Sequence, residues 1–155
     1  MVLSHQTTAV LVRLLHLLAV TVLVGGAVVV WLAFRRDGDD TRDADRTSEH
    51  LLPTAASYEW LFWGALGVVV MTGVGNLGAL APAVPTTETR WGAVLALKLG
   101  VLLGFVLFSM ARSLAVVRVR RFGLSGSDAT LTRAYGLTAG VLVLLLSLAE
   151  VLAHG

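Results

Sequence analysis

With 155 residues, of which 56% are hydrophobic and 14% charged, and a mean hydropathy of +0.81, this chain has far more apolar surface than a soluble domain can bury. The absence of cysteine excludes disulfides, thiolate metal sites and thiol catalysis. The formal net charge of +2 comes from a few arginines near predicted membrane faces, so we expect no nucleic-acid partner. The composition is that of an integral membrane protein whose partner is the lipid bilayer.

Four apolar segments, each long enough to cross a bilayer, follow one another along the sequence. We expect an all-α, antiparallel up-down four-helix bundle with helices over about 7–34, 54–81, 91–117 and 129–153, forming a single domain over 1–155. The first apolar run is too long for a cleavable signal peptide and lacks a cleavage site, so we expect none. Residues 35–50 are predicted to form a polar loop, with Pro53 in the first turn of the next helix.

Aromatic and basic residues mark the predicted ends of these helices. Tyr58, Trp60 and Trp63 near the start of the second segment are typical of the aromatic belt at a membrane interface. Arg112 lies near the predicted end of the third segment, and the arginines of 118–121 follow as a basic exit.

The arginines also predict the orientation, because short loops rich in arginine stay on the cytoplasmic side. The first and third connections hold eight arginines and the second connection holds one. The eight are Arg35, Arg36, Arg42, Arg46, Arg118, Arg120, Arg121 and Arg133. We therefore expect a multi-pass protein of the cell membrane with both termini outside.

Each predicted helix carries one strongly polar residue in its outer half: His16, Asn76, Lys98 and Glu150. An ionisable side chain inside a membrane is by default a candidate functional site, and in an antiparallel bundle these four can converge. Lys98 is also the only lysine of the chain. The alternatives are structural: a hydrogen bond between helices for His16 or Asn76, snorkelling for Lys98, and a solvated carboxylate for Glu150.

Glycine pairs suggest close helix packing. Gly100 and Gly104 form a GxxxG pattern in the third segment, and Gly136 and Gly140 form another in the fourth. Small residues at this spacing let helix backbones approach closely in lipid.

Three segments resemble the membrane domain of the copper-resistance CopD family. They are Leu-His-Leu-Leu-Ala-Val-Thr-Val-Leu-Val-Gly-Gly at 15–26, Met-Thr-Gly-Val-Gly-Asn at 71–76 and Arg-Trp-Gly-Ala-Val-Leu-Ala-Leu-Lys-Leu at 90–99. The resemblance implies copper transport or homeostasis. His16, Met71 and Asn76 would form an outer-facing copper site, and Glu150 or His154 would collect the ion.

The chain is also similar to HemJ-type protoporphyrinogen oxidases, which pair a histidine in the first helix with a lysine in the third. That likeness implies haem b with His16 as an axial ligand, and Lys98 could then bind a haem propionate. In a third alternative, the chain is an accessory subunit of a larger membrane complex, or a homo-oligomer, whose polar residues only hold helices together.

Overall fold

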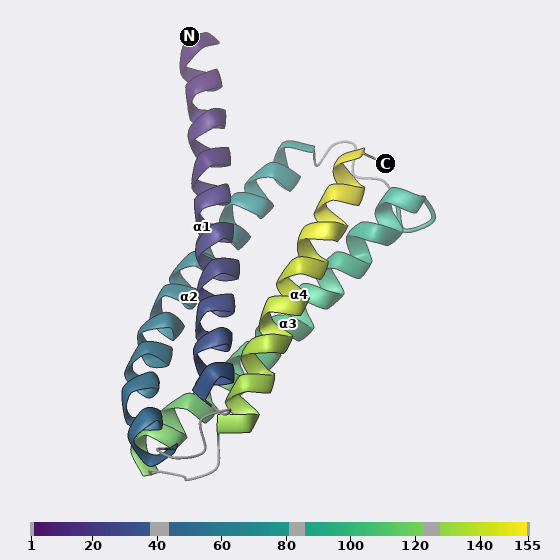
Figure 1. Ribbon diagram of the computed structural model, residues 1–155. Helices are drawn as coiled ribbons and strands as arrows, with labels where there is room; N and C mark the ends of the chain where they lie inside the picture. Colours follow the sequence, from purple (N-terminus) through teal and green to yellow (C-terminus); the bar gives the residue numbers. More distant parts are fainter. Residues whose placement is uncertain (1, 38–43, 81–85, 123–127, 155) are drawn as a thin grey trace.

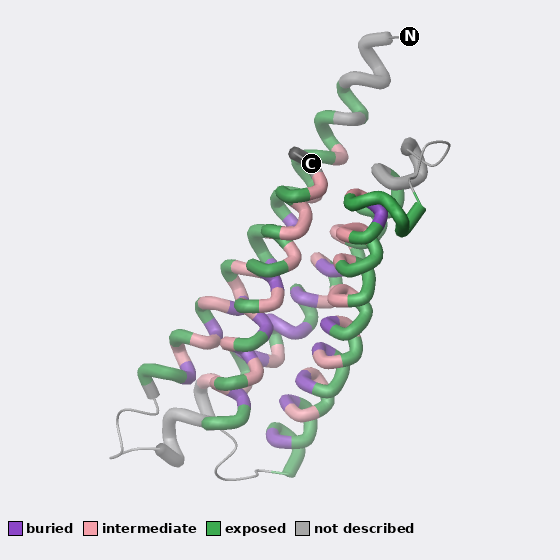
Figure 2. Tube along the Cα trace, turned by 90° about the vertical axis from the view of Figure 1, so that its right-hand side faces the viewer, coloured by how far each residue is buried: buried purple, intermediate pink, exposed green. Residues whose placement is uncertain are grey.

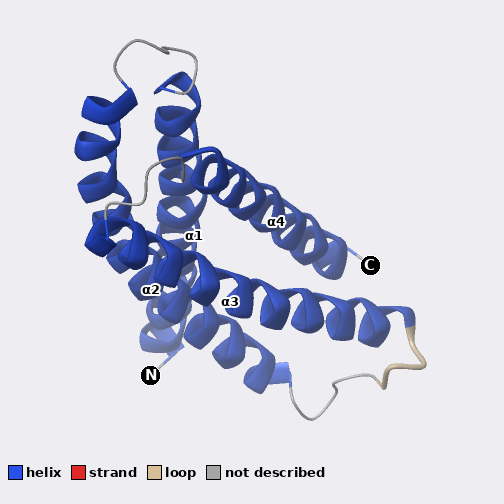
Figure 3. Cartoon of the chain, turned by 90° about the horizontal axis from the view of Figure 1, so that it is seen from below, coloured by secondary structure: helices blue, strands red, loops and turns tan. Residues whose placement is uncertain are grey.

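The computed structural model consists of four long helices joined by short connections (Figure 1). It describes the backbone of 2–37, 44–80, 86–122 and 128–154, and the side chains of 7–8, 10–36, 51–75, 86–122 and 129–152. The helices are α1 (Val2–Asp37), α2 (Ala44–Leu80), α3 (Arg90–Phe122) and α4 (Asp128–His154). In this part of the chain, helix is the only regular secondary structure (Figure 3).

Each helix contains a segment that is long and apolar enough to span a membrane. Helices suit that environment because every backbone N–H and C=O group is paired inside the element, where lipid offers no hydrogen bonds. Large apolar side chains such as Leu103, Leu107 and Val143 are more than half exposed on the outside of the bundle. Such a surface would be unfavourable in water and is favourable in lipid. The chain is therefore a multi-pass membrane protein, as its composition predicted.

Successive helices run up and down alternately, and both chain ends lie at the same end of the bundle, here called the terminus end (Figure 1). The contacts between α1 and α2 follow this arrangement. His16 contacts Thr72, whereas Leu23, further along α1, contacts Tyr58, which comes earlier in α2. The N-terminal turns of α1 extend beyond the other helices (Figures 1 and 2).

Two helix boundaries differ from the prediction. α2 begins at Ala44, so part of the expected polar loop over 35–50 is helical and Pro53 lies inside the helix. A proline inside a helix removes one backbone hydrogen bond and crowds the carbonyl four residues earlier, so Pro53 is a locally unfavourable residue that α2 nevertheless contains. α3 continues to Phe122, so Arg120 and Arg121 lie in its last turn, where positive charge favours the negative end of the helix dipole.

A stripe of buried residues, spaced three or four apart, runs along the inward face of each helix (Figure 2). The stripes consist of Leu23, Ala27, Val30 and Phe34 on α1; Ala55, Tyr58, Phe62 and Leu66 on α2; Phe105, Ser109, Arg112, Val116 and Val119 on α3; and Leu131, Tyr135, Thr138 and Leu142 on α4. On α3 the buried stripe begins only at Phe105, apart from Gly92. The core is thus densest away from the terminus end.

Glycines allow close helix contacts at two places, and only one of them belongs to the predicted pairs. A Cβ atom on Gly26 would overlap the ring of Tyr58, and one on Gly136 would lie 2.9 Å from Nε1 of Trp31. Gly100, Gly104 and Gly140 face open space, so the predicted packing role is wrong for these three. A GxxxG pattern fixes which residues share a helix face, but not whether that face meets another helix.

We expect Gly26→Ala to lower the free energy of unfolding by about 1–3 kcal/mol, because the added methyl group must displace the buried Tyr58 ring. Gly25→Ala is the matched control, since nothing lies within 4 Å of a Cβ atom at that position. Unfolding of the purified variants in mixed micelles measures the difference. Equal stability of the two variants would contradict the close contact.

Candidate functional site

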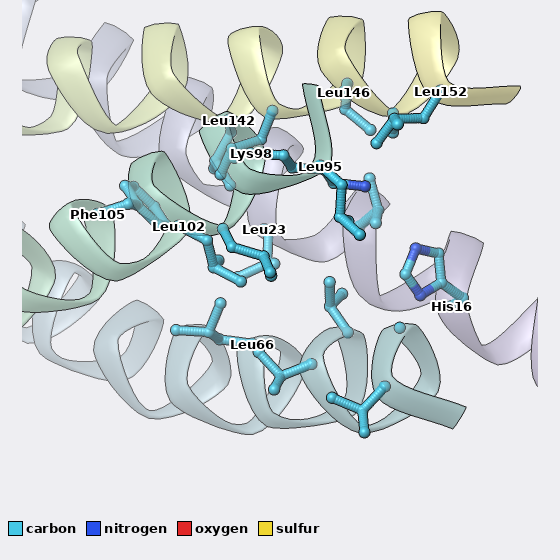
Figure 4. Close-up of a pocket in the computed structure, with 18 of the residues that line it drawn as sticks. His16, Leu23, Leu66, Leu95, Lys98, Leu102, Phe105, Leu142, Leu146 and Leu152 are labelled. Atoms are coloured by element: carbon cyan, nitrogen blue, oxygen red, sulfur yellow. The ribbon is translucent and has the colours of Figure 1, made fainter. Parts of the chain in front are cut away.

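A cavity of about 390 Å³ lies between the four helices at the terminus end (Figure 4). Its lining residues include His16 on α1, Gly73 on α2, Lys98 on α3 and Leu152 on α4. Apart from His16, Lys98 and Trp91, the lining is made of leucine, valine, alanine, glycine and phenylalanine. The size and the few polar groups are those of a small-molecule site, for which about 300–1,000 Å³ is usual.

The His16 ring is held by one hydrogen bond to α2. Its Nδ1 atom lies 2.6 Å from Oγ1 of Thr72. The Thr72 hydroxyl donates to the backbone carbonyl of Val68, at 2.7 Å. A hydroxyl has one proton and a carbonyl has none to give. With the Thr72 proton directed to Val68, Nδ1 of His16 is the nitrogen that donates to Thr72, and Nε2 of the neutral imidazole keeps its lone pair, with no hydrogen bond to any described residue.

This arrangement is the one that a metal-binding histidine usually has. A hydrogen bond from one ring nitrogen fixes the tautomer and the ring orientation, while the other nitrogen binds the metal. The imidazole lies at one end of the cavity (Figure 4). His16 can thus act as a nitrogen ligand or as a proton acceptor.

Lys98 provides the only ammonium group of the cavity and is half-buried among leucines of α3 (Figure 4). Within the described residues it has no hydrogen-bond or ion-pair partner. Nearby, Nε1 of Trp91 donates to the backbone carbonyl of Leu152 at 3.2 Å and ties the start of α3 to the end of α4. A cation in such apolar surroundings favours an anionic group on whatever occupies the cavity.

The structure brings together two of the predicted site residues, His16 and Lys98, which line the same cavity. Met71 does not line it and is 77% exposed on the outside of α2. Glu150 is also exposed and is not a lining residue. The side chains of Asn76 and His154 lie outside those that the structure describes.

The predicted copper ligands are therefore not assembled by the described residues. In that part of the chain, no three His, Asp or Glu side chains lie close enough together to hold a metal ion. Of the predicted copper ligands whose side chains the structure describes, only His16 lines the cavity. The copper site stays a prediction from the family resemblance.

A second polar cluster, which the sequence analysis missed, joins α2, α3 and α4. Nη2 of Arg112 lies 3.2 Å from Oε2 of Glu59 in an ion pair, and the Ser113 hydroxyl donates to the same oxygen. The Tyr135 hydroxyl donates to Oε1 of Glu59 at 2.7 Å. Trp63 Nε1 donates to Ser113 Oγ at 3.0 Å. These five residues are called the Glu59 cluster below.

Aromatic rings surround the Arg112 guanidinium. Its central carbon lies 4.5 Å from the ring centre of Phe62, 4.8 Å from that of Tyr135 and 5.8 Å from that of Tyr58. The Tyr58 hydroxyl in turn donates to the backbone carbonyl of Leu23 on α1, at 2.7 Å. Rings in these positions stabilise a desolvated cation. Together with its hydrogen bonds between α2, α3 and α4, this makes the Glu59 cluster a contact that holds the helices together.

The sequence analysis missed this cluster because it interprets Arg112 and the neighbouring Tyr58 without reference to each other. It predicts Tyr58 in an aromatic belt, whereas the structure packs this side chain in the core of the bundle, 5% exposed. It places Arg112 near the end of the third helix, but α3 continues to Phe122. The signal that could have found the pair is an acid and a base in two neighbouring predicted spans, which lipid requires to be paired.

Comparison with protein-family models, curated proteins and solved structures gave no match to this chain. The likeness to the CopD and HemJ families therefore stays a prediction from the sequence segments.

We expect Glu59→Leu or Arg112→Met alone to lower the free energy of unfolding by about 3–5 kcal/mol, because each leaves one buried charge without its partner. The double variant should be more stable than the two single effects predict, since it removes both charges. A double-mutant cycle by unfolding in mixed micelles measures this coupling. Additive losses would mean that the ion pair does not hold α2 to α3.

Proposed function

We propose that the protein binds haem b in the cavity at the terminus end and serves as a membrane redox protein. One observation carries this proposal: His16, with a free Nε2 lone pair, and Lys98 line the same otherwise apolar cavity. Imidazole is the usual axial ligand of haem iron, which supplies one-electron chemistry when bound. The resemblance to HemJ-type oxidases points to the same two residues.

The residues of the cavity fit the parts of a haem group. Nε2 of His16 would bind the iron, and the Nδ1 hydrogen bond to Thr72 would hold the ring in place. Leucine, valine and phenylalanine side chains match the apolar macrocycle. Lys98 would pair with a propionate, which gives a buried ammonium group the opposite charge that lipid does not provide.

We expect the protein, purified from cells supplied with haem, to show a Soret band that His16→Ala abolishes. Thr72→Val should weaken haem binding about 10- to 100-fold, because it removes the group that orients the ligand. Thr21→Val is the matched control, since that exposed hydroxyl donates only to the Leu17 carbonyl of its own helix. Lys98→Met should weaken binding about tenfold or more through loss of a charge-assisted hydrogen bond.

The same preparation distinguishes the alternatives. Bound copper without a Soret band would support the copper function predicted from the CopD resemblance and contradict haem binding. A colourless, metal-free protein would leave the accessory-subunit interpretation. Haem affinity unchanged by both Thr72→Val and Lys98→Met would mean that the pigment binds elsewhere.

We further propose that both termini face the outside of the cell membrane, so that the cavity opens in the outer half. The basis is the excess of arginines in the helix ends and connections at the end of the bundle opposite the termini. The chain has no cysteine, so Ser125→Cys introduces a single thiol into the third connection. We expect an impermeant reagent to label it only after the membrane is opened. Labelling in intact cells would show the opposite orientation, with both termini inside.

A further inference from the structure

A second cavity, of about 550 Å³, lies on the side of the bundle between α2 and α3. Its walls include Trp60 and Trp63 from α2, and Val117, Arg120 and Arg121 from α3. It lies toward the end of the bundle opposite the termini, where α3 ends at Phe122. None of these residues lines the cavity of His16 and Lys98.

The mouth of this cavity is positively charged. Arg120 and Arg121 are both exposed, in the last turn of α3. Glu59 also lines the cavity, but one of its oxygens is bonded to Arg112 and Ser113 and the other to Tyr135. Its negative charge is thus compensated inside the bundle. Among the residues that the structure describes, Arg120 and Arg121 have no ion-pair partner, and the planar donors of their guanidinium groups match the oxygens of a phosphate.

Polarity changes with depth along the α3 wall. Arg120 and Arg121 lie in the last turn of α3, nearest the end of the bundle. Val116 and Val117 lie one turn deeper in the bundle, and Ser113 lies one turn deeper again. At about 1.5 Å per residue, Arg121 and Ser113 are about 12 Å apart along the helix. Trp60, which is 84% exposed, forms part of the facing wall on α2.

We propose that this cavity is a binding site for an anionic phospholipid. The phosphate contacts Arg120 and Arg121, and an acyl chain lies against Val117 and Trp60. A phospholipid has this same order of charge at the membrane surface and hydrocarbon below it. Free phosphate would use only the arginines and leave the apolar wall without a partner, so the lipid is the occupant that the whole cavity fits.

The test is titration of the purified full chain in neutral detergent with phosphatidylglycerol, followed by native mass spectrometry. We expect the double variant Arg120→Gln/Arg121→Gln to weaken binding about 25-fold, or about fivefold for each arginine. Arg118→Gln is the matched control, because this exposed arginine of α3 does not line the cavity. It should change binding less than twofold. Detergent solution removes any effect of these charges on membrane orientation.

Three further measurements decide the outcome. Phosphatidylcholine should bind at least tenfold more weakly than phosphatidylglycerol, and Trp60→Ala should weaken phosphatidylglycerol binding without changing the charge. An equal loss with Arg118→Gln would show general charge attraction and overturn the site. Displacement of the lipid by millimolar inorganic phosphate, or no effect of Trp60→Ala, would show a plain anion site and also overturn the proposal. Unchanged unfolding curves of the variants confirm that each variant is folded.

Discussion

The ion pair between Glu59 and Arg112 fixes how the four helices meet. Two opposite charges inside a membrane protein are tolerated when they face one another. Nε and Nη1 of Arg112 have no hydrogen-bond partner among the described residues, and the guanidinium group lies against the rings of Phe62 and Tyr135. Here the carboxylate joins α2 to α3, Tyr135 adds α4, and Tyr58 extends the contact to the backbone of α1 at Leu23. All four helices are thus connected at the same height in the bundle, around the ion pair.

This arrangement separates the part that holds the bundle together from the part suited to bind a ligand. The Glu59 cluster uses both carboxylate oxygens for bonds within the bundle. Toward the terminus end the buried stripe of α3 is interrupted, and the space between the helices is lined by leucines around His16 and Lys98. The lining of that cavity includes no member of the Glu59 cluster, so a ligand bound there would not contact the ion pair.

The sequence predicted the elements well and their mutual rotation poorly. Long apolar runs give the four helices, and counting residues from the ends placed His16 and Lys98 in the same half of the bundle, where one cavity includes both. Counting gives depth but not the direction in which a side chain points. Met71 therefore turned out to be exposed, although the neighbouring Thr72 contacts His16. The burial of Tyr58 was missed for the same reason, since only packing decides which face of a helix is buried.

The positions of Glu59 and Arg112 in the chain also bear on how the protein is made. A charged residue at the centre of a lone helix raises the free energy of insertion by about 2.5–3.5 kcal/mol. Because α3 follows α2 directly in the chain, insertion of the two helices as a hairpin would pair the acid with the base and avoid exposing either charge to lipid. Tyr135 follows both in the chain, on α4, so its hydroxyl can donate to the second carboxylate oxygen only after α4 has joined the other helices.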